Sequence, residues 1–115
     1  MHLSGASPRA TLADVEEQSI TVFRSRLRND VPDAYATRAA ELQQRAEGFP
    51  GFVEFKQFVA ADGERVSLIT FDSAEHEAAW RDDPVHRDAQ HEGRDAFYCE
   101  YDIAVCEVQR RHRWP

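Results

Sequence analysis

Stretches of alternating apolar and polar residues predict four β-strands in this chain. They cover Ser19–Leu27, Phe52–Ala60, Arg65–Phe71 and Phe97–Val108. Each is rich in β-branched or aromatic side chains, which favour an extended backbone. Asp62 and Gly63 stand between the second and third stretches, and an Asp-Gly pair is a typical hairpin turn. We therefore expect these two strands to be antiparallel neighbours.

A helical period follows the first strand. From Asp33 to Glu47 the apolar residues recur at spacings of four, three and four, which places them on one stripe of an amphipathic helix. Gly48 and Pro50 then end this helix, because neither residue favours its continuation. The prediction is one helix that packs through a single face.

A second helical region follows the third strand. Asp72, with Glu75 three residues later, resembles a capping box that begins a helix carrying Trp80. Pro84 breaks this helix, and a separate short helix is predicted over Val85–Gly93. The region is thus expected to contain two short helices rather than one.

The order of elements is strand, helix, strand, strand, helix, strand. This order predicts an α+β fold of the ferredoxin-like β-α-β-β-α-β type, with an antiparallel sheet and both helical regions on one face. Residues 18–110 form the predicted domain. Residues 1–17 lack a sustained apolar period and are expected to be a flexible arm, and residues 111–115 a short tail.

Several strands are apolar on both sides. Strict alternation along the second strand places Val53, Phe55 and Val59 on one face, and Phe52 and Phe58 on the other. Helices cover only one face of such a sheet, so an apolar second face needs another cover. A second copy of the chain, related by a twofold axis, is the simplest cover, and we expect a homodimer.

Composition narrows the class of function. The chain has 115 residues, 42% of them apolar, and a formal net charge of −7. This size suits one soluble domain. Nucleic-acid binding requires clustered Lys and Arg, and the one basic cluster, Arg110, Arg111 and Arg113, is expected to be part of a solvated tail. A nucleic-acid partner is therefore not expected.

Neither targeting signals nor disulfides are indicated. No apolar run is long enough to span a membrane, and no N-terminal stretch has the pattern of a signal peptide. Cys99 and Cys106 are seven positions apart on one predicted strand, and a separation of roughly 23 Å is too long for a disulfide. A reduced, cytoplasmic protein is the expectation.

Three groups of residues stand out together. They are Pro50-Gly51-Phe52 before the second strand, Ala79-Trp80 in the second helical region, and the run from His86 to Arg94. With their surroundings, residues 19–108, they resemble the antibiotic-biosynthesis-monooxygenase (ABM) family of dimeric α/β barrels. The resemblance implies a homodimer with a pocket between helices and sheet in each subunit. It also implies an oxidoreductase that oxidises a small phenolic or quinol-like aromatic with O2, without metal, flavin or other cofactor.

Trp80 and His86 are the predicted catalytic residues. The indole of Trp80 can stack on a planar aromatic ligand. The imidazole of His86 titrates near neutral pH, so it can accept a phenolic proton. Each also has a simpler interpretation, with Trp80 as core packing and His86 as an exposed or locally satisfied residue. The predicted substrate-binding residues are Arg24, His76, Gln90, His91 and Tyr101.

Gln90 and His76 are predicted to bind the substrate because of their spacing from His86 and Trp80. Gln90 lies four residues after His86 and shares its helix face, so it can orient either the ring or a ligand. His76 lies four residues before Trp80 and shares the face of that residue.

Alternation separates the two tyrosines of the last strand. Tyr98 and Tyr101 are three positions apart, so they are expected on opposite faces. Tyr101 shares its face with Ile103 and Val105, and we assign it to the buried side. Tyr98 is left unassigned.

A metal site is not predicted. His86 and His91 are five residues apart, about 140° around a helix, so their rings diverge. Haem is the alternative cofactor, because the haem-degrading branch of the ABM family has a ligating His beyond the Trp. Ala89 or Gln90 occupies that position here, with a His on either side. A haem-binding protein, or a dimer that binds a small molecule without catalysis, are the alternative functions.

Overall fold

The structure, a computed structural model, describes residues 17–115. Its strands are β1 (Ser19–Leu27), β2 (Phe52–Val59), β3 (Arg65–Phe71) and β4 (Tyr98–Glu107). Its helices are α2 (Ala34–Glu47), α3 (Ala74–Arg81) and α4 (Pro84–Glu92), and a π-helical turn, Gly93–Phe97, follows α4. The predicted N-terminal arm, residues 1–17, falls outside the described residues except for Glu17.

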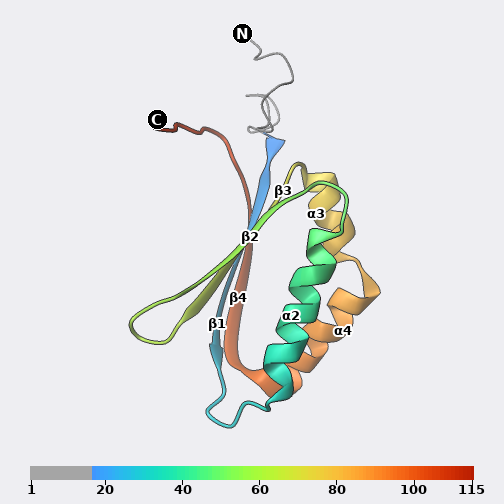
Figure 1. The fold of residues 1–115 in the computed structure, drawn as a ribbon, viewed down its shortest axis with the longest axis vertical. Helices are drawn as coiled ribbons and strands as arrows, with labels where there is room; N and C mark the ends of the chain where they lie inside the picture. Colours follow the sequence, from blue (N-terminus) through green and yellow to red (C-terminus); the bar gives the residue numbers. More distant parts are fainter. Residues whose placement is uncertain (1–16) are drawn as a thin grey trace.

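The strands form one antiparallel sheet in the order β2-β3-β1-β4. All three helices lie on the same side of this sheet, with α2 next to α4 (Figure 1). Each helical crossover joins two strands that are separated by one other strand. This is the ferredoxin-like α+β arrangement, so the predicted fold class is confirmed.

The start of α3 differs from the predicted capping box. Ser73, not Asp72, caps the helix, because its Oγ accepts a hydrogen bond from the backbone N of His76 at 3.2 Å. Asp72 is instead hydrogen-bonded to the ring of His76, with 2.6 Å between Oδ1 and Nδ1. Ser73 is extended, with φ −155° and ψ 161°. The helix therefore begins one residue later than the Asp72–Glu75 pattern requires.

A β-bulge changes the faces of β2. The register with β3 contains one extra residue, Val53, between Phe52 and Glu54. Phe52 and Phe55 consequently face the same side, toward the helices, where both pack on the core. The predicted alternation, which separated Phe52 from Phe55, is wrong because it assumed an unbroken ladder.

A second irregularity occurs where β4 begins. The register with β1 skips Cys99, since Glu100 and Tyr98 lie opposite consecutive residues of β1. Tyr98 and Tyr101 therefore face the same side, with ring centroids 6.0 Å apart. The prediction that these tyrosines lie on opposite faces is wrong for this reason.

The core lies between the sheet and helices α2 and α3. Its buried members are Ala46, Ile69, Phe71 and Trp80, and Phe71 is 0% exposed. Phe52 packs edge-on against Phe71 with ring centroids 6.0 Å apart, an arrangement that aromatic pairs prefer. The core thus holds α3 against β3, the strand that precedes it.

The face of the sheet away from the helices is partly apolar. Val22 and Leu68 lie opposite each other on β1 and β3, and both are half-buried within the single chain. Arg24 is on the same face and forms an ion pair with Glu64, 3.0 Å from Nη2 to Oε1. The two-sided apolar pattern is therefore present, with charged residues toward the β2–β3 hairpin.

Candidate functional site

A cavity of about 440 Å³ lies between the helices and the sheet. Its floor is made of helix-facing side chains of the strands, among them Phe23, Phe55 and Ile69. Helix α2 contributes Tyr35 and Leu42, and α3 and α4 close the cavity on another side. A concave, largely apolar and aromatic lining with few polar groups is typical of a small-molecule site.

The side chains of Trp80 and His86 are stacked at the wall of this cavity. Their ring centroids are 4.3 Å apart and their planes differ by 19°. Trp80 comes from α3 and is buried, and its ring also meets the edge of Phe49 at 5.1 Å. The two predicted catalytic residues are thus in direct contact, and both line the cavity.

The ring of His86 is held in a desolvated environment. Its Nδ1 is buried and has no hydrogen-bond partner among residues 17–115. Burial lowers the pKa of His86. The nearby backbone carbonyls of Trp80 and Arg81 act in the opposite direction, although neither lies in hydrogen-bonding geometry with Nδ1. The imidazole is therefore neutral near pH 7, the form that can accept a proton.

An ion pair from α2 fixes the start of α4, and with it the position of His86. Asp83 caps α4, because its Oδ2 accepts a hydrogen bond from the backbone N of His86 at 3.1 Å. Pro84 occupies the first turn, where its missing N–H costs nothing. Arg45 of α2 donates two hydrogen bonds to the Asp83 carboxylate, at 2.7 and 2.8 Å. This bidentate geometry ties α2 to the first turn of α4.

We expect Asp83→Ala to lower the free energy of unfolding more than Asp83→Asn does. Asn retains a capping side chain, whereas Ala loses the cap, which contributes about 1 kcal/mol. The Arg45 guanidinium holds the pKa of Asp83 below its usual range. The wild-type contribution is therefore present above the ordinary carboxyl pKa and is lost as the pH falls through the lower folded value.

Urea unfolding at about pH 7 and about pH 2.5 measures this contribution. Both Asp83 variants should lose less stability than the wild-type protein between these two conditions. Equal losses in all three proteins would show that the Arg45–Asp83 pair does not stabilise the fold.

Four of the predicted site residues meet in the cavity, and three do not. Trp80, His86, Gln90 and Tyr101 all line it. Arg24 lies on the opposite face of the sheet, in its ion pair with Glu64. The two remaining residues, His76 and His91, are outside the lining, hydrogen-bonded to Asp72 and Arg94 respectively.

Glu77 is a cavity residue that the sequence reasoning missed. It is 4% exposed and lines the cavity beside Trp80. Burial raises the pKa of its carboxyl group. The available signal was its position three residues before Trp80, which puts both on one face of α3. Acidic residues are frequent on helices, so that signal alone is weak.

Tyrosines form the other end of the cavity. Tyr35, Tyr98 and Tyr101 line it, with ring centroids 6.1 Å apart for Tyr35–Tyr98. Burial raises the pKa of the Tyr98 hydroxyl, so this phenol stays protonated near neutral pH. Gly93 leaves room for the Tyr98 ring, because a Cβ at this glycine would lie 2.7 Å from Tyr98 Cε2.

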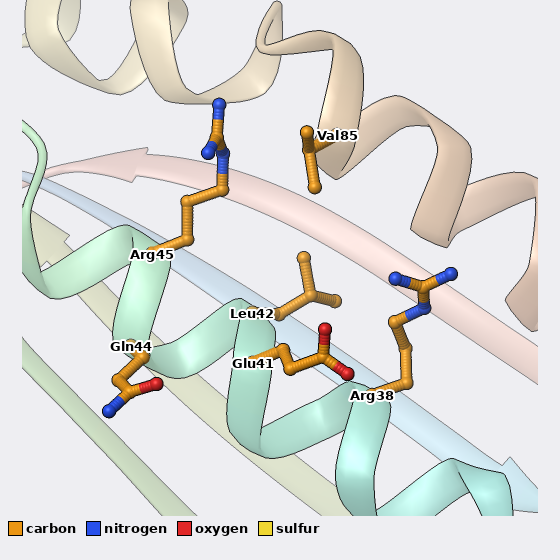
Figure 2. Close-up of a pocket in the computed structure, with 6 residues that line it drawn as sticks. All are labelled: Arg38, Glu41, Leu42, Gln44, Arg45 and Val85. Atoms are coloured by element: carbon orange, nitrogen blue, oxygen red, sulfur yellow. The ribbon is translucent and has the colours of Figure 1, made fainter.

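A second hollow, of about 410 Å³, lies on the outer surface between α2 and α4. Figure 2 shows Arg45 reaching from α2 toward the layer of α3 and α4, with Leu42 and Val85 facing each other across the hollow. The two arginines at this site are Arg38, paired with Glu92 at 2.7 Å, and Arg45, paired with Asp83 at 2.7 Å. Because their charges are already matched, we assign no ligand to this hollow.

The fold and the placement of the cavity define a class of protein, a ferredoxin-like α+β domain with a small-molecule cavity between sheet and helices. No protein-family model matches the chain. The resemblance to the ABM family is confirmed at the level of the fold, because a solved structure named as an antibiotic biosynthesis monooxygenase and another named as a cofactor-independent oxygenase share this fold. In the described part of the chain, none of the helices is long and apolar enough to cross a membrane.

Particular proteins can be named as similar. The uncharacterized protein YqjZ of Bacillus subtilis (strain 168) is 27% identical over 90 residues, which are 78% of this chain and 79% of YqjZ. A Nitrosomonas europaea protein provisionally named an antibiotic biosynthesis monooxygenase has a TM-score of 0.69 at 13% identity, over 80% of this chain and 90% of that one. SnoaB, a cofactor-independent oxygenase from Streptomyces nogalater, has a TM-score of 0.70 at 14% identity, over 86% and 98% of the two chains.

Proposed function

We propose that this protein is a cofactor-independent monooxygenase of the antibiotic-biosynthesis type that oxidises a phenolic or quinol-like aromatic with O2. The observation that carries the proposal is the stacked Trp80–His86 pair at the wall of an aromatic-lined cavity. The imidazole is neutral there, and because its Nδ1 is buried, Nε2 is the proton acceptor in this proposal. The shared fold with SnoaB, named as a cofactor-independent oxygenase, also supports the proposal.

In the proposed reaction His86 accepts the proton of the substrate hydroxyl. The resulting phenolate transfers an electron to O2, and the superoxide formed combines with the ring radical to give a peroxide on a ring carbon. This peroxide takes back the proton held by His86, and loss of water, which includes the hydrogen of that ring carbon, leaves a carbonyl. A phenol with a free para carbon and one O2 thus give one quinone and one water, and no external reductant is needed. The apolar floor keeps water away from the reactive anion.

The other cavity residues have supporting roles in this proposal. Trp80 stacks on the substrate ring or holds His86 in place, and Gln90 and Tyr101 orient the substrate oxygen by hydrogen bonds. The assignments of Arg24, His76 and His91 as substrate-binding residues stay predictions. Within the single chain these three side chains lie outside the cavity lining.

Oxygen uptake by the purified protein tests the proposed reaction. An oxygen electrode should record consumption with 1-naphthol and with phenols that have a free para carbon, above the rate of autoxidation, with one quinone and no hydrogen peroxide formed per O2 consumed. Addition of a chelator should not change the rate. If these aromatics bind but no O2 is consumed, the alternative of a non-catalytic binding protein is favoured.

Titration with haemin, followed by absorbance, tests the haem alternative. His86 is the histidine that could ligate haem from the cavity, because His91 lies outside the lining beside Arg94. A Soret band that appears with the wild-type protein and is lost in His86→Ala would favour haem binding over the proposed oxygenase.

The proposal includes a homodimer formed through the helix-free face of the sheet. Val22 and Leu68 are half-buried in the middle of that face, and Phe58 at the β2 edge is 49% exposed. A second copy would remove this apolar surface from water. Sedimentation should give twice the chain mass of 13.2 kDa. A stable monomer at micromolar concentration would overturn this part of the proposal.

A further inference from the structure

Glu77 is a buried carboxylate that the proposed reaction does not use. It is 4% exposed and lines the cavity beside Trp80. Its one ion-pair partner among the described residues is Arg81, with 3.5 Å between Nη2 and Oε1. This is longer than the roughly 2.7–2.9 Å of a charge-assisted hydrogen bond. The carboxylate oxygens therefore retain capacity to accept a hydrogen bond from another group.

A structural role does not explain this arrangement well. An i,i+4 ion pair on a helix contributes little to stability, and it forms equally well on a solvated face. Burying a carboxylate is unfavourable unless hydrogen bonds compensate for the lost water. Burial raises the pKa of Glu77, the Asp82 charge acts in the same direction and Arg81 opposes them. A ligand that donates a hydrogen bond to the carboxylate would replace the lost water.

We infer that Glu77 is a second ligand-binding group of the cavity, and that the ligand is an aromatic with two hydroxyl groups, one facing Glu77 and the other His86. This inference rests on the proposed function for the hydroxyl that faces His86. The two acceptors enter the cavity from different helices, Glu77 from α3 and His86 from α4. A ligand with a single hydroxyl satisfies only one of them and leaves the other desolvated.

Binding of matched naphthols tests the inference without requiring turnover. Isothermal titration calorimetry compares 1-naphthol with the dihydroxynaphthalene isomers, which share the ring system and differ in the second hydroxyl. At least one isomer should bind roughly tenfold more tightly than 1-naphthol, as expected for a hydrogen bond to a charged group. Glu77→Leu should abolish this preference while the affinity for 1-naphthol stays within about twofold. Glu77→Gln, which keeps a neutral acceptor, should retain part of it.

Arg81→Gln is the matched control, because it removes the ion pair and leaves the carboxylate in place. It should keep the preference for the dihydroxy ligand. Circular dichroism melting of each variant establishes that it is folded, and Glu77→Gln serves if Glu77→Leu is not. The inference is overturned if no isomer binds more tightly than 1-naphthol, or if the full preference survives in Glu77→Leu or, where only that variant folds, in Glu77→Gln.

The outcomes separate this inference from the proposed function. A preference that depends on Glu77, in a protein that consumes no O2, supports the inference and counts against the oxygenase. O2 consumption by a protein whose preference for the dihydroxy ligand is unchanged in Glu77→Leu supports the oxygenase and overturns the inference.

Discussion

Phe71→Ala is expected to lower the free energy of unfolding by about 3–5 kcal/mol, the usual cost of removing a buried Phe side chain. Phe71 is 0% exposed at the end of β3, and it packs against Phe52 with ring centroids 6.0 Å apart. Truncation would leave a void between the sheet and α3 that neighbouring side chains cannot fill without moving. Because domains of this size are stable by only about 5–15 kcal/mol, the variant should be close to unfolding.

Urea denaturation followed by circular dichroism measures this loss. Phe71→Leu is the matched variant, because it keeps a large apolar side chain, and it should cost less than half as much. Val59→Ala, at a position that is 58% exposed on β2, should be nearly neutral. A Phe71→Ala protein within about 1 kcal/mol of wild type would show that the core does not depend on this ring.

His86→Ala is expected to lower kcat/KM for aromatic oxidation by roughly 10²- to 10⁴-fold, the usual contribution of a general base. The wild-type rate should also fall as the pH drops through the folded pKa of His86, which burial holds below the ordinary 6.5. Below that pH the imidazole is protonated and cannot accept the substrate proton. The variant should therefore be slow at all pH values and lack this acid limb.

Trp80→Phe is the companion variant for this experiment. It keeps an aromatic ring against His86, so the acid limb of the pH profile should remain even if the rate falls. The two variants thus separate the loss of the base from a change in packing. A His86→Ala enzyme within about twofold of wild type, with the acid limb unchanged, would mean that another group accepts the proton.

The sequence predicted the elements better than their faces. Strands β1 and β3 begin and end where alternation places them, because their ladder is regular along its length. The faces of β2 and β4 were predicted wrongly next to Val53 and Cys99, where one extra residue interrupts the register. A bulge depends on the partner strand and on packing, so a single sequence contains little information about it.

The same limit applies to the candidate site. The segment with Trp80 and His86 could be singled out because an aromatic residue and a histidine flank a helix-breaking Pro. Arg24 was assigned to the site although it shares a face of β1 with Val22, because both faces of β1 carry apolar residues. Its alternation therefore does not say which face the helices cover. Glu77 was missed because its burial arises from tertiary packing rather than from its neighbours in sequence.

Gly93 affects the shape of the cavity, although it is not one of the lining residues. A single added methyl group there would overlap the ring of Tyr98, which would then have to move. Since Tyr98 lines the cavity, its new position would reshape the space available at the tyrosine end. The range of accepted ligand sizes is therefore adjustable from a residue outside the cavity lining. For protein engineering, Gly93→Ala is a way to alter selectivity while every lining side chain keeps its identity.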